Sequence, residues 1–355
     1  MIADRTLTFT LRPCLAAAVL LAWGAADSPA QPPPGTRSGE VVPRDVRELY
    51  DRGLHYLATT QTEAGDWPSA YGQGPGGTGL CVMAFLASGE DPNFGIYSNH
   101  VRKALRSMIA SQDASTGILG GGMYHHGFGM LALAEAYGAV DERNLWPDPK
   151  ARGKRSLGQA LELAVRGAIT SQKKNSNGGW RYTPDSSDAD TSVSGAVLMG
   201  LLAARNAGIE VPDDVVDRAI AYYKSMTSTG GQVGYSGGLG GFGDSLARSS
   251  IAALVHAIAR RKDLPSFKST ITYLTGNLEQ SASNYPEYTR YYQAQALFQG
   301  DVAAWEKWNK LLVRQIKQAQ QPDGSITGQY GPSIGTSMSL LALALNYRFL
   351  PIYER

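Results

Sequence analysis

QTEAGDW, residues 61–67, is a glycine-containing turn that separates two segments of opposite character. In residues 44–60, before the turn, charged positions interrupt apolar ones at the spacing of a helix with one solvent-facing side. In residues 78–88, after the turn, the run GLCVMAFLA would form a helix that is apolar nearly all round and needs neighbours on every side. The stretch therefore predicts a helical hairpin whose first helix is exposed and whose second is buried.

The same order of segments occurs six times along the chain, at intervals of about fifty residues. Five of the six units have a turn glycine in this series, namely Gly65, Gly117, Gly178, Gly230 and Gly324, and the last gap spans two units. An open stack of hairpins would need more polar units at its two ends, and neither the first nor the last unit is more polar than its neighbours. We therefore predict an all-α fold, an (α/α)6 toroid in which six helical hairpins form an inner and an outer ring. This single domain spans residues 44–355.

The segment before the repeats has a different character. Residues 1–30 are typical of a signal peptide, because Arg5 and Arg12 precede an apolar run that ends near the small residues Ser28 and Ala30. Residues 31–43 are rich in proline and glycine and are interpreted as a linker. We expect an exported protein, periplasmic or extracellular, that retains no stable transmembrane segment once the signal is cleaved.

The composition limits the classes of function. Hydrophobic residues make up 43% of the 355 residues, which suffices for a large core and excludes disorder for most of the chain. The net charge is +2 without a basic block, so nucleic acid is not an expected partner. Cleavage of the signal would leave Cys81 as the one cysteine, which excludes an intrachain disulfide and a thiolate metal site. We expect neither a cofactor nor a metal, and the sequence does not indicate an oligomeric state.

The turns resemble those of a known superfamily. Gln61-x-x-x-Gly65-x-Trp67 is similar to the QxxxGxW repeat of squalene and oxidosqualene cyclases and of protein prenyltransferase β subunits, which are α/α toroids. Residues 172–180 resemble a copy with a longer loop, and residues 320–326 a degenerate copy in which isoleucine replaces tryptophan. The resemblance covers residues 44–350 and implies the toroid fold. In this repeat the glutamine side chain can hydrogen-bond free backbone groups at the ends of neighbouring helices, and the tryptophan ring stacks on the glutamine.

The resemblance also implies where an acid would lie. Class II cyclases begin their reaction with a DxDDT motif, whose central carboxyl group protonates an alkene or an epoxide. Here Asp188-Ala189-Asp190-Thr191 is one aspartate short of that motif, and the chain has one helical domain where full cyclases have two. Cys81 lacks the nearby aspartate of the zinc-dependent prenyltransferases. If the chain is an enzyme, we expect acid-initiated chemistry of the terpenoid-cyclase type, an isomerase or lyase; whether it catalyses at all is left open.

Candidate site residues lie at the starts of the predicted inner helices, which a closed ring would gather at one mouth. Aromatic rings there suit an apolar or a sugar ligand, and aspartates there also suit helix capping. Adjacent histidines point about 100° apart on a helix, so they are not expected to share a metal ion. The catalytic candidates are Asp188, Asp190 and His125, and the ligand-binding candidates are His126, Tyr182, Tyr235, Asp244, Arg248, Tyr291 and Thr336. The glycine-rich residues 230–243 are expected to form a mobile loop over the mouth.

Three functions are consistent with these features. The first is an exported repeat protein that binds, or binds and transforms, an apolar isoprenoid or lipid-like ligand in the central funnel. The second is a carbohydrate-active α/α-barrel lyase or hydrolase that uses His125, Tyr291 and a carboxylate. The third is an interaction scaffold without catalysis. A dry apolar funnel would favour the first function, a wet groove the second, and a centre filled by side chains the third.

Overall fold

The structure, a computed structural model, describes residues 42–69, 74–146, 154–243, 245–280, 284–347 and 350–353. The expected signal peptide, residues 1–30, and nearly all of the expected linker lie outside these residues, as does Asp244. Residues 42–355 form one compact unit. Over the described ranges this unit consists of α-helices and short 3₁₀ turns, without a β-strand.

Helices of two kinds alternate along this unit. The outer helices are α1 (Arg44–Thr60), α3 (Ser98–Ala110), α5 (Leu157–Lys173), α7 (Asp213–Met226), α9 (Pro265–Thr275) and α11 (Val302–Ala319). The inner helices are α2 (Pro75–Leu86), α4 (Met123–Ala136), α6 (Thr191–Asn206), α8 (Ser245–Ile258), α10 (Pro286–Gly300) and α12 (Pro332–Leu343). Three 3₁₀ turns complete the described elements, η1 (Glu142–Asn144), η2 (Ala344–Asn346) and η3 (Pro351–Tyr353).

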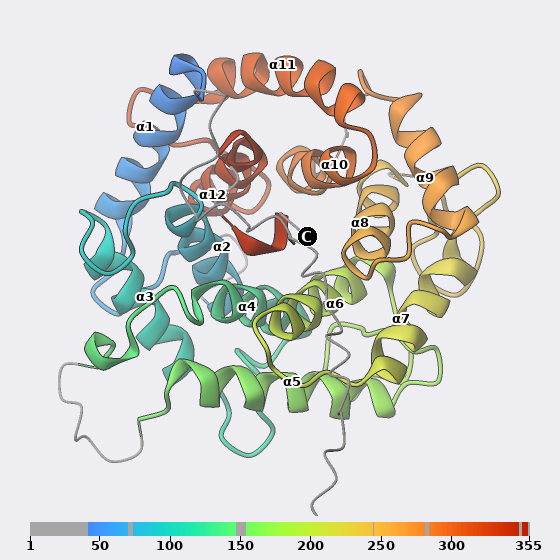
Figure 1. Cartoon of the computed structure of the whole chain (residues 1–355), viewed down its shortest axis with the longest axis horizontal. Helices are drawn as coiled ribbons and strands as arrows, with labels where there is room; N and C mark the ends of the chain where they lie inside the picture. Colours follow the sequence, from blue (N-terminus) through green and yellow to red (C-terminus); the bar gives the residue numbers. More distant parts are fainter. Residues whose placement is uncertain are drawn as a thin grey trace, which may run out of the picture. The chain divides into compact units, whose positions relative to one another are not determined.

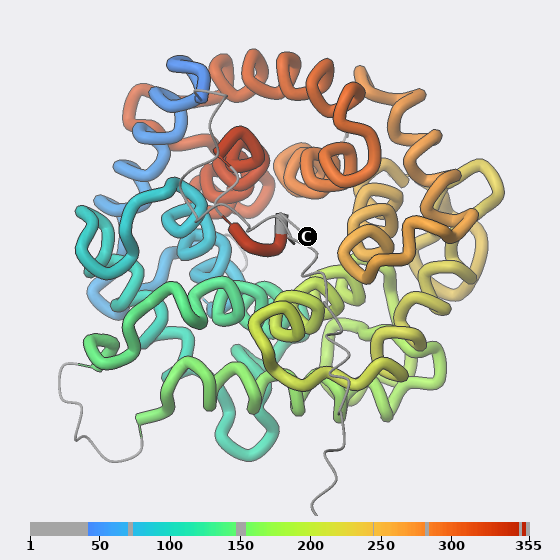
Figure 2. The backbone as a smooth tube through the Cα atoms, viewed as in Figure 1, coloured from blue at the N-terminus to red at the C-terminus, as the bar shows by residue number. Residues whose placement is uncertain are grey.

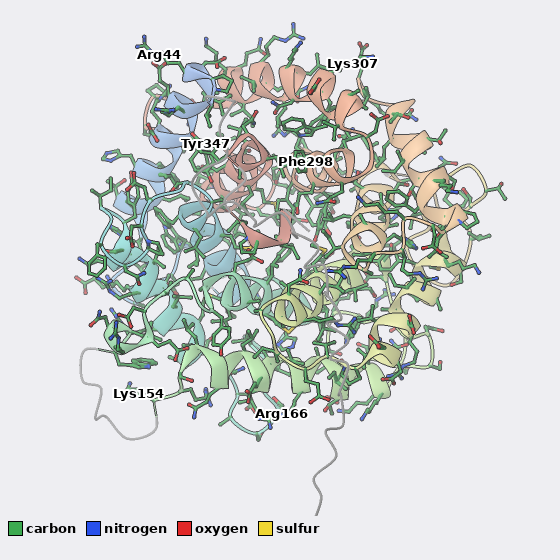
Figure 3. All side chains as sticks on the ribbon, viewed as in Figure 1. Arg44, Lys154, Arg166, Phe298, Lys307 and Tyr347 are labelled. Carbon is green, nitrogen blue, oxygen red and sulfur yellow. The ribbon has the colours of Figure 1, made fainter. Side chains whose placement is uncertain are left out.

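The inner helices form a closed ring (Figures 1 and 2). Each contacts the inner helix before and after it, and α12 contacts α2. The outer helices surround this ring and expose charged side chains such as Arg44, Arg166 and Lys307, whereas Phe298 and Tyr347 lie further in (Figure 3). The predicted all-α toroid of six helical hairpins is therefore confirmed.

Glycines let neighbouring inner helices approach closely. Gly79 is the fifth residue of α2, and a Cβ atom added to it would lie 2.8 Å from the carbonyl oxygen of Phe128 in α4. Gly127 is the fifth residue of α4, and its added Cβ would lie 2.6 Å from the carbonyl carbon of Ala196 in α6. A second contact in each pair also joins similar depths, because Gly76 lies against His125 and Gly200 lies against Met130. The helices of each pair therefore run side by side in the same direction. Their starts gather at one end of the ring, which we call the mouth.

The glutamine and tryptophan of each complete turn hold the end of the outer helix. Gln172 donates from Nε2 to the carbonyl of Gly178 at 2.7 Å and to that of Val215, in the next outer helix, at 2.9 Å. Trp180 is 1% exposed and donates from Nε1 to the carbonyl of Ala168 at 2.9 Å. The turn is thereby fixed both to the helix that precedes it and to the next outer helix of the ring.

The last turn repeats this interaction across the ends of the domain. Gln320 donates from Nε2 to Gly324 at 3.1 Å and to the carbonyl of Leu49 in α1 at 2.8 Å. Gly324 has a φ of +91° and lies against the backbone of Arg52, also in α1. The sixth hairpin therefore contacts the first as the earlier hairpins contact their successors, which explains why no polar capping unit is needed.

The prediction of Gly230 as a turn glycine is wrong by one position. Gly231, with a φ of +82°, takes the place that the sequence assigned to Gly230, and it lies against the carbonyl of Ser269 in α9. The Gly231 N–H donates to the carbonyl of Ser228 at 3.0 Å. This bond closes the turn one residue later than the spacing of the repeats predicts.

Two glycines with nearly the same backbone provide a test of this packing. Gly117 (φ +78°) and Gly138 (φ +83°) are both left-handed, so alanine is strained at either position. A Cβ at Gly117 would lie 2.1 Å from the carbonyl oxygen of Leu163, whereas a Cβ at Gly138 meets nothing within 4 Å. We expect Gly138→Ala to cost about 1 kcal/mol and Gly117→Ala at least about 2 kcal/mol in urea unfolding. Equal costs would contradict the contact between this turn and α5.

Candidate functional site

The site is built around Asp190, which caps the N-terminus of α6. Its Oδ1 atom accepts hydrogen bonds from the N–H groups of Ser192 at 2.9 Å and Val193 at 2.8 Å. Its Oδ2 atom accepts no hydrogen bond from the described residues, although the side chain is fully buried. Burial disfavours the charged form and raises the pKa of Asp190 to about 6. Capping therefore uses one carboxyl oxygen and leaves the other for a different role.

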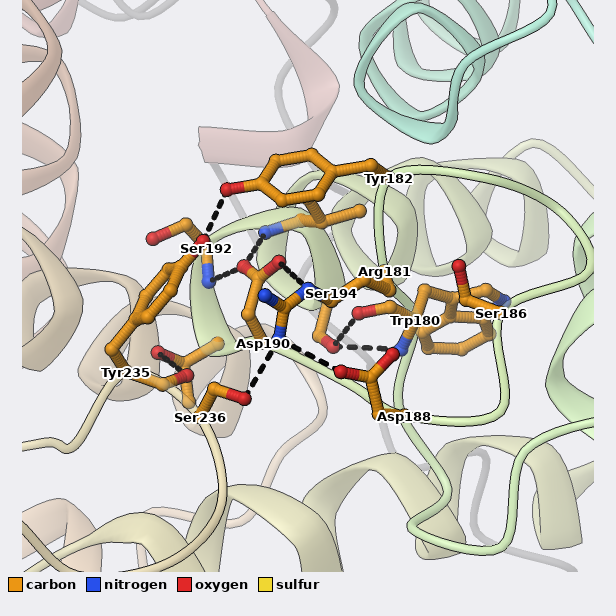
Figure 4. Close-up of polar contacts among 12 residues, drawn as sticks. Trp180, Arg181, Tyr182, Ser186, Asp188, Asp190, Ser192, Ser194, Tyr235 and Ser236 are labelled. Carbon is orange, nitrogen blue, oxygen red and sulfur yellow. Dashed lines mark hydrogen bonds and ion pairs between the residues drawn. The ribbon is translucent and has the colours of Figure 1, made fainter.

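Arg181 joins the two predicted aspartates (Figure 4). Its Nη1 atom lies 3.0 Å from Oδ2 of Asp188, and its Nε atom lies 3.7 Å from Oδ2 of Asp190. Nη1 also donates to the hydroxyl of Ser236 at 2.7 Å. Sequence analysis missed Arg181 and Ser236, because their pairing depends on the glycine-rich loop reaching α6. The available signal was local: an arginine directly after the turn tryptophan, with Asp188 and Asp190 in the following nine residues.

Tyr182 and Tyr235, which we call the tyrosine pair, accompany this arginine. Their hydroxyl groups are hydrogen-bonded to one another. The guanidinium carbon of Arg181 lies 5.3 Å from the ring centroid of Tyr182 and 5.5 Å from that of Tyr235, within cation–π range. Tyr182 is 48% exposed, so nearly half of its surface is open to solvent. The structure thus brings four predicted site residues together: Asp188, Asp190, Tyr182 and Tyr235.

The side chain of Arg248 binds backbone carbonyl groups of the glycine-rich loop, residues 230–243. Its Nε atom donates to the carbonyl of Val233 at 3.0 Å, and its Nη2 atom donates to the carbonyls of Gly241, at 3.1 Å, and Gly243. These bonds join the loop, which the sequence predicts to be mobile, to the start of α8. The guanidinium also lies 5.9 Å from the ring of Tyr235. Arg248 therefore positions the loop that carries one member of the tyrosine pair.

The two adjacent histidines have different surroundings. His125 is half-buried beside the start of α2, where its Nδ1 atom accepts a hydrogen bond from the N–H of Gly76 at 3.3 Å. Burial lowers the pKa of His125. His126 is fully buried, accepts a hydrogen bond from the N–H of Leu119 at 3.1 Å, and has its pKa lowered by burial to about 4. His126 is thus a neutral interior side chain that holds a turn.

Thr336 and Tyr291 also lie inside the ring. Thr336 is fully buried, and its hydroxyl accepts a hydrogen bond from the N–H of Ile326 at 2.8 Å. Thr336 therefore holds the turn before α12. Tyr291 is 2% exposed, and its ring lies 6.2 Å from that of Phe128. Neither residue is brought to Arg181 and the tyrosine pair.

Aromatic side chains fill the ring just below the mouth. Phe128 and Tyr291 are each the sixth residue of their helices, α4 and α10, which lie opposite one another in the ring. Their ring contact therefore crosses the lumen about 8 Å below the mouth. We call the connected rings the aromatic layer; it comprises Tyr124, Phe128, Tyr288, Tyr291 and Tyr292. Burial raises the pKa of Tyr124, and the charge of Asp190 raises it further.

The described residues contain neither a cluster of metal ligands nor a membrane-spanning helix. No group of three or more histidine, cysteine, aspartate or glutamate side chains in these ranges is placed to hold a metal ion. None of the helices that the structure describes is long and apolar enough to cross a membrane.

No family model matches the chain, and no curated protein matches it in sequence. Solved structures do match it. The apo type II terpene cyclase MstE from Scytonema is 15% identical, with a TM-score of 0.59 over 86% of this chain and 99% of that one. The same cyclase has been solved with geranylgeranyl dihydroxybenzoate as substrate. The GH76A α-1,6-mannanase from Salegentibacter sp. HEL1_6 is 9% identical, with a TM-score of 0.59 over 84% of this chain and 98% of that one.

These similarities define the class of protein as an α/α toroid. The sequence identities are low, so what the chain shares with the cyclase and the mannanase is the fold. The fold that the resemblance implied is therefore supported, while the chemistry must be argued from the residues at the mouth.

Proposed function

We propose that this chain is an exported protein that binds an apolar molecule of the isoprenoid class at the mouth and in the lumen below it, with Asp190 as the acid that faces the ligand. The observation that carries this proposal is the Oδ2 atom of Asp190, which is buried and accepts no hydrogen bond from the described residues. A carboxyl group in this state is neutral below about pH 6 and has a proton to give.

The surroundings of Asp190 suit an apolar ligand. Below it lies the aromatic layer, and beside it lies the tyrosine pair, so a hydrocarbon would meet aromatic faces on two sides. If Asp190 protonates an alkene, its O–H bond breaks, a C–H bond forms and a carbocation remains on the substrate. The carboxylate left behind faces Arg181, and aromatic faces stabilise the cation. Such a step resembles the opening step of class II cyclases.

A sugar ligand is the second candidate. Tyr182 and Tyr285, 48% and 39% exposed, offer aromatic faces at the starts of inner helices, as sugar-binding sites do. Hydrolysis of a glycoside, however, uses two carboxyl groups that flank the scissile bond. Asp188 and Asp190 are instead both drawn to the single guanidinium of Arg181. This pairing favours one acid in an apolar setting over two carboxylates acting on a sugar from opposite sides.

Native mass spectrometry tests the ligand class. We expect the chain to retain geranylgeraniol, an isoprenoid alcohol, at one molecule per chain, and not to retain α-1,6-mannotriose. The double variant Tyr182→Ala/Tyr235→Ala should weaken the binding of geranylgeraniol about tenfold, because it removes two aromatic contacts. Phe94→Ala is the matched control, since Phe94 is 84% exposed and lies outside the site. Retention of mannotriose without geranylgeraniol would replace this proposal by the sugar-binding one.

A further inference from the structure

The C-terminal segment follows α12 and the short turn η2 in the chain. Its described part, residues 350–353, contains η3. η3 contacts α6, which lies opposite α12 in the inner ring. In the view down the ring, η3 lies within the outline of the inner helices, between α12 and α6 (Figures 1 and 2).

Two aliphatic side chains of this segment are buried in the lumen. Leu350 is 1% exposed and Ile352 is 2% exposed, and both belong to the continuous hydrophobic core. Pro351, between them, is exposed, so the segment has one face toward the core and one toward solvent. α12 runs away from the mouth, and the three residue steps from Tyr347 to Leu350 span at most about 11 Å. Residues 350–353 therefore lie toward the end of the ring opposite the mouth.

The packing of the lumen limits where a ligand can go. A protein interior is close-packed, so a molecule that enters it must take the place of something already there. The aromatic layer is carried by helices α4 and α10, whose side chains can rotate but cannot leave. Among the described residues inside the inner ring, residues 350–353 belong to none of the α-helices that form it. Their departure is the change that frees volume without opening the ring.

We propose that the lumen opposite the mouth is a binding site for a flexible hydrocarbon chain, which Leu350 and Ile352 occupy while the ligand is absent. This inference rests on the proposed function. It adds where the apolar tail of the ligand binds, and it adds that Leu350 and Ile352 compete with the tail for this space. A ligand that binds only when the segment is displaced has an apparent Kd equal to its intrinsic Kd divided by the fraction of molecules in which the segment is displaced.

The first experiment measures displacement in the full-length chain. In a Cys14→Ser background, Ile352→Cys adds one thiol at a buried position, and Cys81 is an internal control because burial raises the pKa of its thiol. We expect maleimide to label the introduced thiol slowly in the free protein and at least about tenfold faster with saturating geranylgeraniol. α-1,6-Mannotriose should leave the rate unchanged. Labelling that stays constant or slows while geranylgeraniol binds would overturn the inference.

The second experiment removes the competitor and separates this inference from the proposed function. The full-length double variant Leu350→Asp/Ile352→Asp should expel the segment and tighten geranylgeraniol binding about tenfold. Phe94→Asp adds a charge at an 84% exposed position and should leave binding unchanged. Equal affinity of the wild type and the double variant would refute the inference alone. Failure of both to bind would refute the proposed function as well, and binding by the double variant only would support both.

Discussion

Replacing Trp180 by alanine is expected to lower the free energy of unfolding by about 3–5 kcal/mol. The indole is 1% exposed, and its Nε1 atom donates to the carbonyl of Ala168 at 2.9 Å. Alanine would leave a cavity and an unpaired carbonyl at the point where α5, the turn and α6 meet. Such a loss would approach the total stability of a typical domain, about 5–15 kcal/mol. Urea unfolding followed by far-ultraviolet circular dichroism measures it.

Phe94→Ala is the control for this substitution, because it also removes an aromatic ring but at a position that is 84% exposed. We expect its cost to stay within about 0.5 kcal/mol. A Trp180→Ala variant that is as stable as the control would mean that the turn tryptophan does not hold the outer helix, and the structural account of the repeat would fail.

The architecture could be predicted from the sequence because each hairpin carries its own local signals. The glutamine, the glycine and the tryptophan of the turn lie within a few residues of one another. Their partners lie in the same turn, in the helix before it or in the next outer helix of the chain, as Val215 does for Gln172. The bond from Gln320 to Leu49 is the long-range exception, at 2.8 Å. A bond of this type could still be expected, because in a closed ring the outer helix that follows the last turn is α1. The error at Gly230 arose because loop lengths vary between units.

The site was only partly predictable, and the reason is physical. Asp190 could be found because its capping position and the resemblance both point to it. Arg181 could not, because its partner Ser236 lies in a loop whose path depends on three carbonyls held by Arg248. His126 was chosen as a polar residue at a helix start, yet such residues serve turns as readily as ligands. Asp244 lies outside the described residues.

The filled lumen was the least predictable feature. The contact between Phe128 and Tyr291 joins helices on opposite sides of the ring, so it depends on the rotation of every inner helix about its axis. The burial of Leu350 and Ile352 depends on the chain turning back after α12. No local pattern encodes either event. A centre filled by side chains is the feature that the sequence analysis expects of a scaffold. If residues 350–353 can be displaced, however, a filled centre is also compatible with ligand binding.

Asp190→Asn is expected to change how stability depends on pH. Burial raises the pKa of Asp190 from 3.8 to about 6, so the fold favours the neutral acid and the unfolded chain ionises first. The wild type should therefore lose stability as pH rises from about 4 to about 6, by about 3 kcal/mol in total once the carboxyl is fully charged. Asparagine caps a helix as well as aspartate does but carries no charge at any pH. Relative to the wild type, the variant should gain this amount between pH 4 and pH 8, measured by urea unfolding.

Asp188→Asn is the matched control, because it removes a carboxylate that pairs with the same arginine but is 59% exposed. We expect it to change stability by less than about 1 kcal/mol. If the difference between Asp190→Asn and the wild type stays constant with pH, Asp190 is an ordinary capping aspartate and the acid proposal fails. If the difference widens as expected, capping does not explain why a carboxyl group occupies this position. Oδ1 alone satisfies Ser192 and Val193, and the charge on Oδ2 then costs the fold stability at neutral pH.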